Sequence, residues 1–380
     1  MSRRGGARDR AHLLLLAPSR GFGGGIERVT SSLEREWPGP VTRVDLYRAG
    51  IERAGDRSVA VKGRFAVRAL AAALRPGSRP ALALSLHIGL LPVALAAARV
   101  SAARTGLFVH GAEAWGPAGL LCRSMVQHCD LLAAQSSFAT HWFCERARVD
   151  ASRVNRLPAV IDPALEHSAR VQPTTYRQSP RPTLLTVSRI DPVHDYKGHF
   201  AIAEALPEVL ARRPRTTWTV VGAGEDRPRL ERRCAELGIA HATRFAGRVG
   251  EDALYDLYRS ATVFVLPSFA DVDPRRPAGE GFGLVFAEAG AFGLPIISSA
   301  AAGGESELLQ HGVTALTVPR GQPAPLSAAI VRLLEDPALR ERLGSQVRAR
   351  VLANHTPARL RAALEEIAGF SPSNRPSPGA

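Results

Sequence analysis

The chain is poor in cysteine, aromatic residues and lysine, and it contains no long apolar run. Its four cysteines show no metal-ligand spacing, which excludes a disulfide-rich scaffold and a cysteine-based zinc module and favours a reducing compartment. No stretch approaches the ~20 apolar residues that span a bilayer. Aromatic residues make up only 6% and do not interleave with the basic ones, which argues against nucleic-acid binding despite a net charge of +14.

What the chain does contain is a large apolar fraction and an uneven distribution of positive charge. With 380 residues, of which 45% are hydrophobic and 22% charged, it is long enough for two globular domains. Residues 1–170 hold 24 Lys and Arg against 13 Asp and Glu, whereas residues 171–380 hold 25 against 22. A basic first half favours an anionic lipid surface, although an arginine-rich composition alone would also raise the total. We expect a cytoplasmic protein, either free or peripheral at the inner face of the cell membrane.

A strand–loop–helix rhythm runs through the chain twice, with a Pro- and Ser-rich segment between the two passes. This pattern predicts an α/β protein of two doubly wound, Rossmann-like domains facing a cleft. The predicted parts are an N-terminal domain over 1–170, a linker over 171–182, a C-terminal domain over 183–355, a terminal helix over 356–370 that crosses back to the first domain, and a disordered Ser/Pro/Gly tail over 371–380.

A glycine-rich stretch in the second half joins a predicted strand to an apolar helix. The strand over 262–268 ends in Pro-Ser, and Glu280 follows it in the loop. Gly283 begins a helix whose first amides are unpaired, and Glu288 lies about one turn into that helix. Such a junction can hold an anion with amides and a polyol with carboxylates, although acidic residues at a helix start also simply complement its dipole.

Other polar residues also follow predicted strands. Arg189 and Lys197 follow the strand over 183–188, and Lys197 is one of two lysines in the chain, the other being Lys62. A lysine in an arginine-rich chain suggests a compact positive charge that binds a phosphate group. The alternative is a lysine that has been retained by chance and has no role. His110 ends the strand over 105–109, at the edge where α/β domains bind ligands.

The glycines at 21, 23, 24 and 25 follow the first strand and precede a helix, an arrangement suited to phosphate. They miss the dinucleotide spacing G-x-G-x-x-G, although Asp45 imitates the ribose-binding acid. With the second glycine loop at 222–224, they raise an alternative class, an NAD(P)-dependent oxidoreductase. That interpretation leaves Lys197 and Glu280 without a role.

A helix over 58–75 carries an apolar stripe with basic residues largely off it. Lys62, Arg64, Arg68 and Arg75 form either a solvated face or a dock for a membrane surface or a phosphorylated acceptor.

Taken in order along the chain, these residues closely resemble the retaining glycosyltransferases of the family numbered four (group 1 type), which have the GT-B fold. The resemblance implies transfer of a sugar from a GDP- or UDP-linked donor to a hydroxyl acceptor, with retention of configuration, no cofactor and no required metal. The spacing of Asp271 and Asp273 imitates a metal motif of another fold, and we assign no metal there. The matching positions are Gly23–Gly25, His110, Arg189, Lys197, Glu280, Glu288 and Gly303–Glu307.

Residue roles follow from the same resemblance. It implies catalytic roles for His110, Arg189, Lys197 and Glu280, and acceptor contacts for Gly23 and Glu113. The basic first half of the chain favours a lipid-linked saccharide acceptor, as in envelope polysaccharide assembly, with a soluble natural product as the alternative. The implied donor-binding residues are Gly24, Gly25, Arg189, Lys197, Gly247, Val249, Glu280, Gly281, Phe282, Gly283, Leu284 and Glu288.

Overall fold

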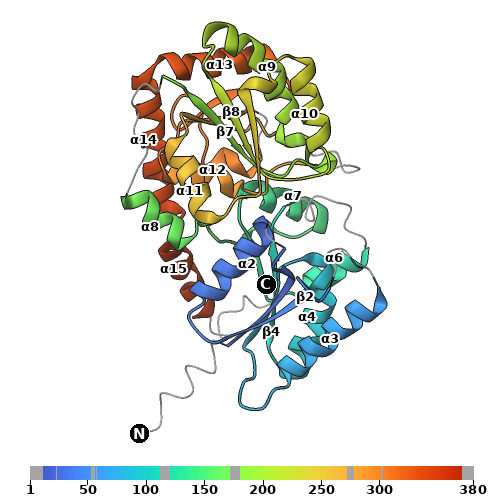
Figure 1. Cartoon of the computed structure of the whole chain (residues 1–380). Coiled ribbons are helices and arrows are strands. Elements are labelled where there is room, and N and C mark those ends of the chain that lie inside the picture. The colour runs from blue at the N-terminus through green and yellow to red at the C-terminus, as the bar shows by residue number, and fades with distance from the viewer. Residues whose placement is uncertain are drawn as a thin grey trace. The chain divides into compact units, whose positions relative to one another are not determined.

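The computed structural model (Figure 1) describes residues 12–22, 24–52, 56, 58–111, 120–171, 180–271, 278–300 and 303–369. Two compact units make up the chain. The first comprises residues 1–160 and 357–380, and the second comprises residues 161–356.

The first unit is a six-stranded parallel sheet with the order β2-β1-β3-β4-β5-β6. The inner strands β1, β3, β4 and β5 are mainly apolar because helices cover a parallel sheet on both faces, and residues 13–17 of β1 are completely buried. The strands are β1 (Leu13–Arg20), β2 (Val41–Arg48), β3 (Leu82–Ser85), β4 (Arg104–Val109), β5 (Leu131–Ala134) and β6 (Val154–Arg156). The helices are α2 (Gly25–Glu36), α3 (Val59–Ala73), α4 (Leu91–Ser101), α6 (Leu120–Gln127), α7 (Ser137–Ala147) and α15 (Pro357–Ala368).

Helix α15 ends the described chain and returns to the first unit, where it packs on α2. Arg361 of α15 donates hydrogen bonds from Nε and one Nη to the buried carboxylate of Glu36, at 3.1 and 2.8 Å. This two-pronged ion pair joins residues 325 positions apart, and therefore ties the end of the chain to the first unit.

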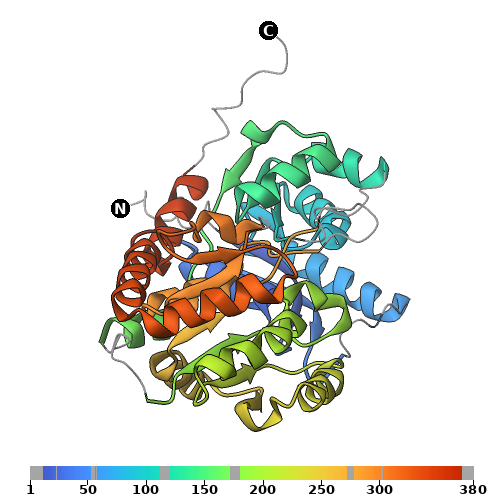
Figure 2. The ribbon, with the colours of Figure 1, turned by 90° about the horizontal axis from the view of Figure 1, so that it is seen from above.

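The second unit has the strand order β12-β11-β10-β7-β8-β9, again all parallel. Helices α9 and α13 lie side by side on one face of this sheet (Figures 1 and 2). The strands are β7 (Thr183–Val187), β8 (Thr217–Val221), β9 (Thr243–Gly247), β10 (Val263–Val265), β11 (Ile296–Ser299) and β12 (Leu316–Val318). The helices are α8 (Pro163–Val171), α9 (His199–Arg212), α10 (Arg227–Glu236), α11 (Glu251–Ser260), α12 (Leu284–Ala291), α13 (Pro323–Glu335) and α14 (Pro337–Asn354).

The division between the units falls ten residues before the predicted boundary at residue 170. Helix α8 belongs to the second unit because it packs on α12, and because the amide of Ile161 donates to the carbonyl of His355 at 3.0 Å. Most of the predicted linker, residues 172–179, and the predicted tail over 371–380 lie outside the described residues. Within the described ranges, no helix combines the length and the apolar character that crossing a membrane requires.

Candidate functional site

Strands β7 and β10 are neighbours at the centre of the second sheet, and the chain leaves them in opposite directions. From β7 it continues to β8 and β9 on one side, and from β10 to β11 and β12 on the other. The carboxyl ends of such a pair leave a crevice between diverging loops, which is where open α/β sheets bind ligands. Arg189 follows β7, and Glu280 follows β10, so the topology brings the two predicted loops to this point.

Backbone packing holds the Arg189 loop against the loop after β8. The amide of Ile190 donates to the carbonyl of Ala223 at 3.2 Å, and the amide of Asp226 donates to the carbonyl of Ile190 at 2.9 Å. A Cβ on Gly222 or Gly224 would overlap the carbonyl of Ser188 or Ile190, respectively. These glycines are therefore explained by the close approach of two loops, without any bound dinucleotide.

His199, the first residue of α9, contacts the start of this loop. Its Nε2 is 2.8 Å from the hydroxyl of Ser188, and the residue is buried. Burial first, and then the nearby Lys197 ammonium, lowers the pKa of His199 to about 4. The ring is consequently neutral at physiological pH and serves to hold Ser188 beside Arg189.

Lys197 ends the 3-10 helix Pro192–Lys197, and Gly198 follows with a φ of 76°. A Cβ at Gly198 would lie 2.8 Å from the ring and from the carbonyl oxygen of Pro267, which leaves β10. Only glycine satisfies both the left-handed backbone and this contact. The Lys-Gly pair is thereby fixed against the carboxyl end of β10.

Lys197 forms an ion pair with Glu280 across 83 residues of sequence. The lysine side chain is 12% exposed and the glutamate side chain 9%, so the pair is largely removed from water. Charges held in this way interact strongly, and each depends on the other to offset the cost of desolvation. The structure thus brings together two residues that the sequence predicted in one site.

The loop after Glu280 turns sharply into α12. Gly283 has a φ of 79° at the helix N-cap, and a Cβ there would lie against the ring of Phe286. The first turn of α12, from Leu284, directs its positive end to this loop. Phe282 is buried, with its ring 4.8 Å from that of His355, so only the backbone of Phe282 is available to a ligand.

Glu288 is buried in α12 and accepts a hydrogen bond of 2.9 Å from the hydroxyl of Tyr258 in α11. The Tyr258 ring stacks on Phe292 with centroids 5.6 Å apart, which fixes the direction of the hydroxyl. Tyr258 lies in none of the motifs described above and was not predicted as a site residue.

Glu305 lies within the matching segment Gly303–Glu307, but no role of its own was predicted for it. It lies in the 3-10 helix Gly304–Glu307, whose first amide donates to the carbonyl of Glu280 at 2.9 Å. Burial, and then the charge of Glu280, raises the pKa of Glu305 to about 8. The amides of Gly303 and of Glu305 itself and the ammonium of Lys197 act in the opposite direction.

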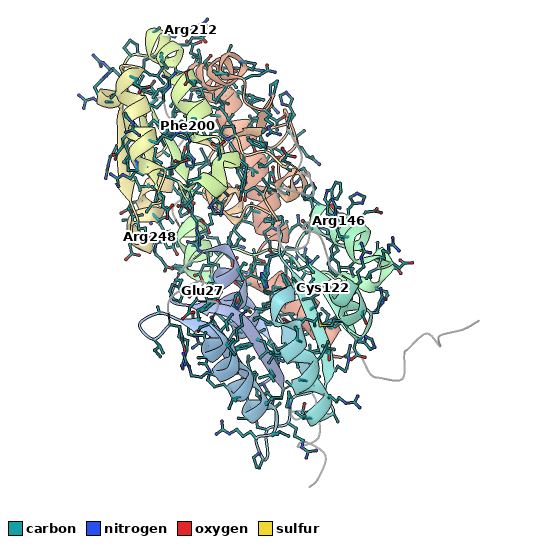
Figure 3. The ribbon with its side chains drawn as sticks, turned by 90° about the vertical axis from the view of Figure 1, so that its right-hand side faces the viewer. Glu27, Cys122, Arg146, Phe200, Arg212 and Arg248 are labelled. Atoms are coloured by element: carbon teal, nitrogen blue, oxygen red, sulfur yellow. The ribbon has the colours of Figure 1, made fainter. Side chains whose placement is uncertain are left out.

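The end of β9 is hydrogen-bonded to the loop after β8. Gly247 has a φ of 68°, and its carbonyl accepts from the amide of Gly222 at 2.8 Å. The guanidinium of Arg227 lies 5.5 Å from the ring centre of Phe245 and would be 3.7 Å from a Cβ on Gly247. The neighbouring Arg248 is exposed beside the partly buried Val249 (Figure 3).

The predicted residues of the first unit lie at the ends of β1 and β4. Gly24 has a φ of 111° and begins α2, and a Cβ on Gly25 would meet nothing within 4 Å, which leaves space above the helix start. The carboxylate of Glu27 (Figure 3) accepts the amides of Gly21 and Phe22 and so shapes the preceding loop. The buried His110 ring lies 4.7 Å from that of Phe108. Gly23 and Glu113 lie outside the described residues.

Comparison with known proteins bears on both units. Residues 173–350 match the family model described as Glycosyl transferases group 1. A GDP-mannose-dependent alpha-(1-6)-phosphatidylinositol monomannoside mannosyltransferase of Mycobacterium tuberculosis is 30% identical over 262 residues, which cover 64% of this chain and 65% of that protein. A D-inositol 3-phosphate glycosyltransferase of Streptomyces bingchenggensis is 35% identical over 205 residues, covering 50% of this chain and 42% of that protein. The chain therefore spans less than two thirds of the length of these relatives.

A solved structure shows the fold. The Anabaena protein HepE, in complex with UDP and glucose, superposes with a TM-score of 0.70 at 17% identity, over 94% of this chain and 99% of that one. The two six-stranded units are thus the two Rossmann-like domains of the GT-B fold, and the fold prediction is confirmed.

Proposed function

We propose that the chain is a group 1 glycosyl transferase, the family whose model matches residues 173–350, and that it transfers a sugar from a GDP- or UDP-linked donor to a hydroxyl acceptor, with retention of configuration. The observation that carries the proposal is the Lys197–Glu280 ion pair at the point where β7 and β10 diverge. A cation there can take a diphosphate, and a carboxylate can take sugar hydroxyls. The names of the relatives support both donor types, since one is GDP-mannose-dependent and HepE is bound to UDP and glucose.

The cationic residues stabilise the leaving group, which is the nucleoside diphosphate of the donor. Lys197 turns from Glu280 to the diphosphate of the bound donor, and Arg189 and the first amides of α12 add to the positive field. They stabilise the negative charge that develops on the diphosphate as its bond to the sugar breaks. These groups take the place of a metal ion, so transfer proceeds without one and without a further cofactor.

The carboxylates orient the donor. Glu280, released by Lys197, accepts hydrogen bonds from sugar hydroxyls, and Glu288 accepts from the ribose. His110 keeps its proposed role beside the transferred sugar. The acceptor hydroxyl bonds to the anomeric carbon on the face that the diphosphate leaves, and its proton passes to the departing phosphate oxygen. No covalent sugar–enzyme intermediate is required.

Release of the nucleoside diphosphate tests this activity. Purified protein is incubated in EDTA with UDP-glucose or GDP-mannose and a lipid extract, and both UDP and GDP are assayed. We expect release of one of them, reduced ~10²–10³-fold in Lys197→Ala, the cost of removing one donor that stabilises transition-state charge. The exposed Arg232→Ala is the matched control and should behave as wild type. Unchanged turnover of Lys197→Ala would overturn the assignment.

The proposed acceptor is a lipid-linked saccharide of envelope polysaccharide assembly, and the outer face of α3 supports it. Val61, Phe65 and Ala69 are buried on one side of this helix. On the other side Val59 is 86% exposed and Val67 is 67% exposed. The exposed basic residues Lys62, Arg64 and Arg75 also lie on or directly after α3. Exposed apolar side chains flanked by cations are suited to an anionic membrane surface.

Binding to lipid vesicles tests this face. We expect the protein to sediment with phosphatidylglycerol vesicles and not with phosphatidylcholine vesicles, and Arg64→Ser with Val67→Ser to weaken binding by roughly fivefold or more. Arg232→Ser with Val313→Ser is the matched control in the second unit. Equal binding to both lipids, or no effect of the α3 variant, would favour the alternative, a soluble natural-product acceptor.

The oxidoreductase alternative has lost its main support. The glycines at 222 and 224 are explained by packing against the Arg189 loop, and the glycine loop at 21–25 does not have the dinucleotide spacing.

A further inference from the structure

Glu305 is a buried acid whose two carboxyl oxygens form no well-aligned hydrogen bond within the described ranges, although the amides of Gly303 and of Glu305 itself lie near them. Its residue exposure is 2%, and both carboxyl oxygens are inaccessible to solvent. The carboxyl folds back over Gly303, where a Cβ would overlap its Oε2 and lie 3.1 Å from the carbonyl oxygen of Glu280. A buried carboxyl that is so poorly hydrogen-bonded is costly, so its retention at this point calls for a functional explanation.

The groups that face Glu305 belong to the donor site. From the 3-10 helix before α9 come Lys197 and Tyr196, and from the loop after β10 comes Glu280. Burial, followed by the charges of Glu280 and Glu305, raises the pKa of the Tyr196 hydroxyl, which stays neutral. The cluster therefore contains one ammonium, one paired carboxylate and a second carboxyl that shares their surroundings.

We propose that Glu305 is a positioning residue for the donor diphosphate, and that its neutral form permits Lys197 to leave Glu280 and bind phosphate. This inference rests on the proposed function, because it assigns Lys197 to the diphosphate. An ionised Glu305 would add a second negative charge, beside that of Glu280, to the cluster that contains Lys197. That charge would hold the ammonium in the carboxylate cluster and repel the entering diphosphate.

The sign of the pH dependence follows from linkage. Bound diphosphate is negative and draws Lys197 away, so it disfavours ionised Glu305 and raises the pKa of this group above its ligand-free value of about 8. Nucleotide binding is therefore coupled to proton uptake around pH 8, and affinity falls as the pH rises through that value. His194 has its pKa lowered by burial and by Lys197 and Arg189, so it titrates below this window. The terminal phosphate of a nucleoside diphosphate loses its last proton near pH ~6, also below it.

Calorimetric titration of the nucleoside diphosphate between pH 7 and pH 9.5 tests the inference. For the wild type we expect affinity to fall by about threefold to tenfold between pH 7 and pH 9, where one unit of pKa shift corresponds to a tenfold change. Glu305→Gln, which imitates the neutral acid, should bind as wild type at pH 7 and lose no affinity at pH 9. Glu341→Gln, at an exposed position of α14, is the matched control and should keep the wild-type pH dependence.

A second readout measures the protons taken up on binding. The binding enthalpy at pH 8, measured in two buffers of different ionisation enthalpy, should reveal proton uptake by the wild type, and by Glu341→Gln, but not by Glu305→Gln. Equal pH dependence of wild type and Glu305→Gln, or no proton uptake by the wild type, would overturn the role of Glu305 while nucleotide binding stands. Absence of any nucleotide binding would instead overturn the proposed function.

Discussion

Replacing Lys197 by Met removes the charge of the Lys197–Glu280 pair while retaining most of the apolar stem. The variant leaves the Glu280 carboxylate in a site that is largely closed to water and that also holds the carboxyl of Glu305. Breaking a fully buried ion pair in this way costs ~3–5 kcal/mol. Because both side chains keep some exposure, we expect the free energy of unfolding of the second unit to fall by about 2 kcal/mol.

A compensating variant separates this stability effect from the functional one. Glu280→Gln combined with Lys197→Met leaves two neutral side chains in contact, so no buried charge is unpaired. We expect the double variant to recover most of the lost stability in urea unfolding but none of the nucleotide release. If Lys197→Met alone is as stable as wild type, the ion pair does not exist in solution. If the double variant recovers turnover, Lys197 does not serve the diphosphate.

Two further variants test the framework of the site. Tyr258→Phe removes the hydrogen bond to Glu288 but keeps the ring stack. We expect nucleotide affinity, measured by calorimetry, to fall by roughly threefold to tenfold and the free energy of unfolding to fall by ~1–3 kcal/mol. Wild-type affinity of this variant would show that Glu288 needs no such partner. Gly224→Ala forces the loops after β7 and β8 apart, and we expect a loss of ~1–3 kcal/mol in urea unfolding together with weaker nucleotide binding. In the control variant Gly250→Ala the new Cβ meets nothing within 4 Å, so the free energy of unfolding should fall by less than about 1 kcal/mol. Equal losses of stability in the two glycine variants would contradict the explanation by packing.

The architecture and the centre of the site could be predicted because both follow from local patterns. Apolar runs such as 262–268 mark buried parallel strands, and polar residues directly after them must gather at one edge of the sheet. Arg189, Lys197 and Glu280 are placed at one edge by this rule alone, and the structure adds the ion pair between Lys197 and Glu280.

Helix α8 was missed although signals for it were present. Asp162 caps the helix by accepting the amide of Ala164 at 2.8 Å, Pro163 occupies the first turn, and Glu166 pairs with Arg170 one turn later. The predicted boundary was instead taken from the Pro- and Ser-rich residues that follow this helix.

Tyr258 and Glu305 could not have been found in this way. Each depends on contacts between elements distant in sequence: Tyr258 reaches a carboxylate 30 residues ahead, and Glu305 is buried because its helix begins on the backbone of Glu280. In the sequence, Glu305 is one member of the matching segment Gly303–Glu307, and no local pattern indicates that its carboxyl is buried. Burial of the Phe282 ring against His355 leaves the backbone of Phe282 for its predicted donor contact.

The central claim is that the crevice of the second unit binds the diphosphate of a nucleotide sugar through side chains and amides, without a metal. Calorimetric titration with UDP, GDP and NAD in excess EDTA tests it most directly. We predict micromolar binding of UDP or GDP and none of NAD. Binding of NAD alone would contradict the account and restore the oxidoreductase alternative, and nucleoside diphosphate binding that appears only after a divalent cation is added would contradict the role given to Arg189 and Lys197.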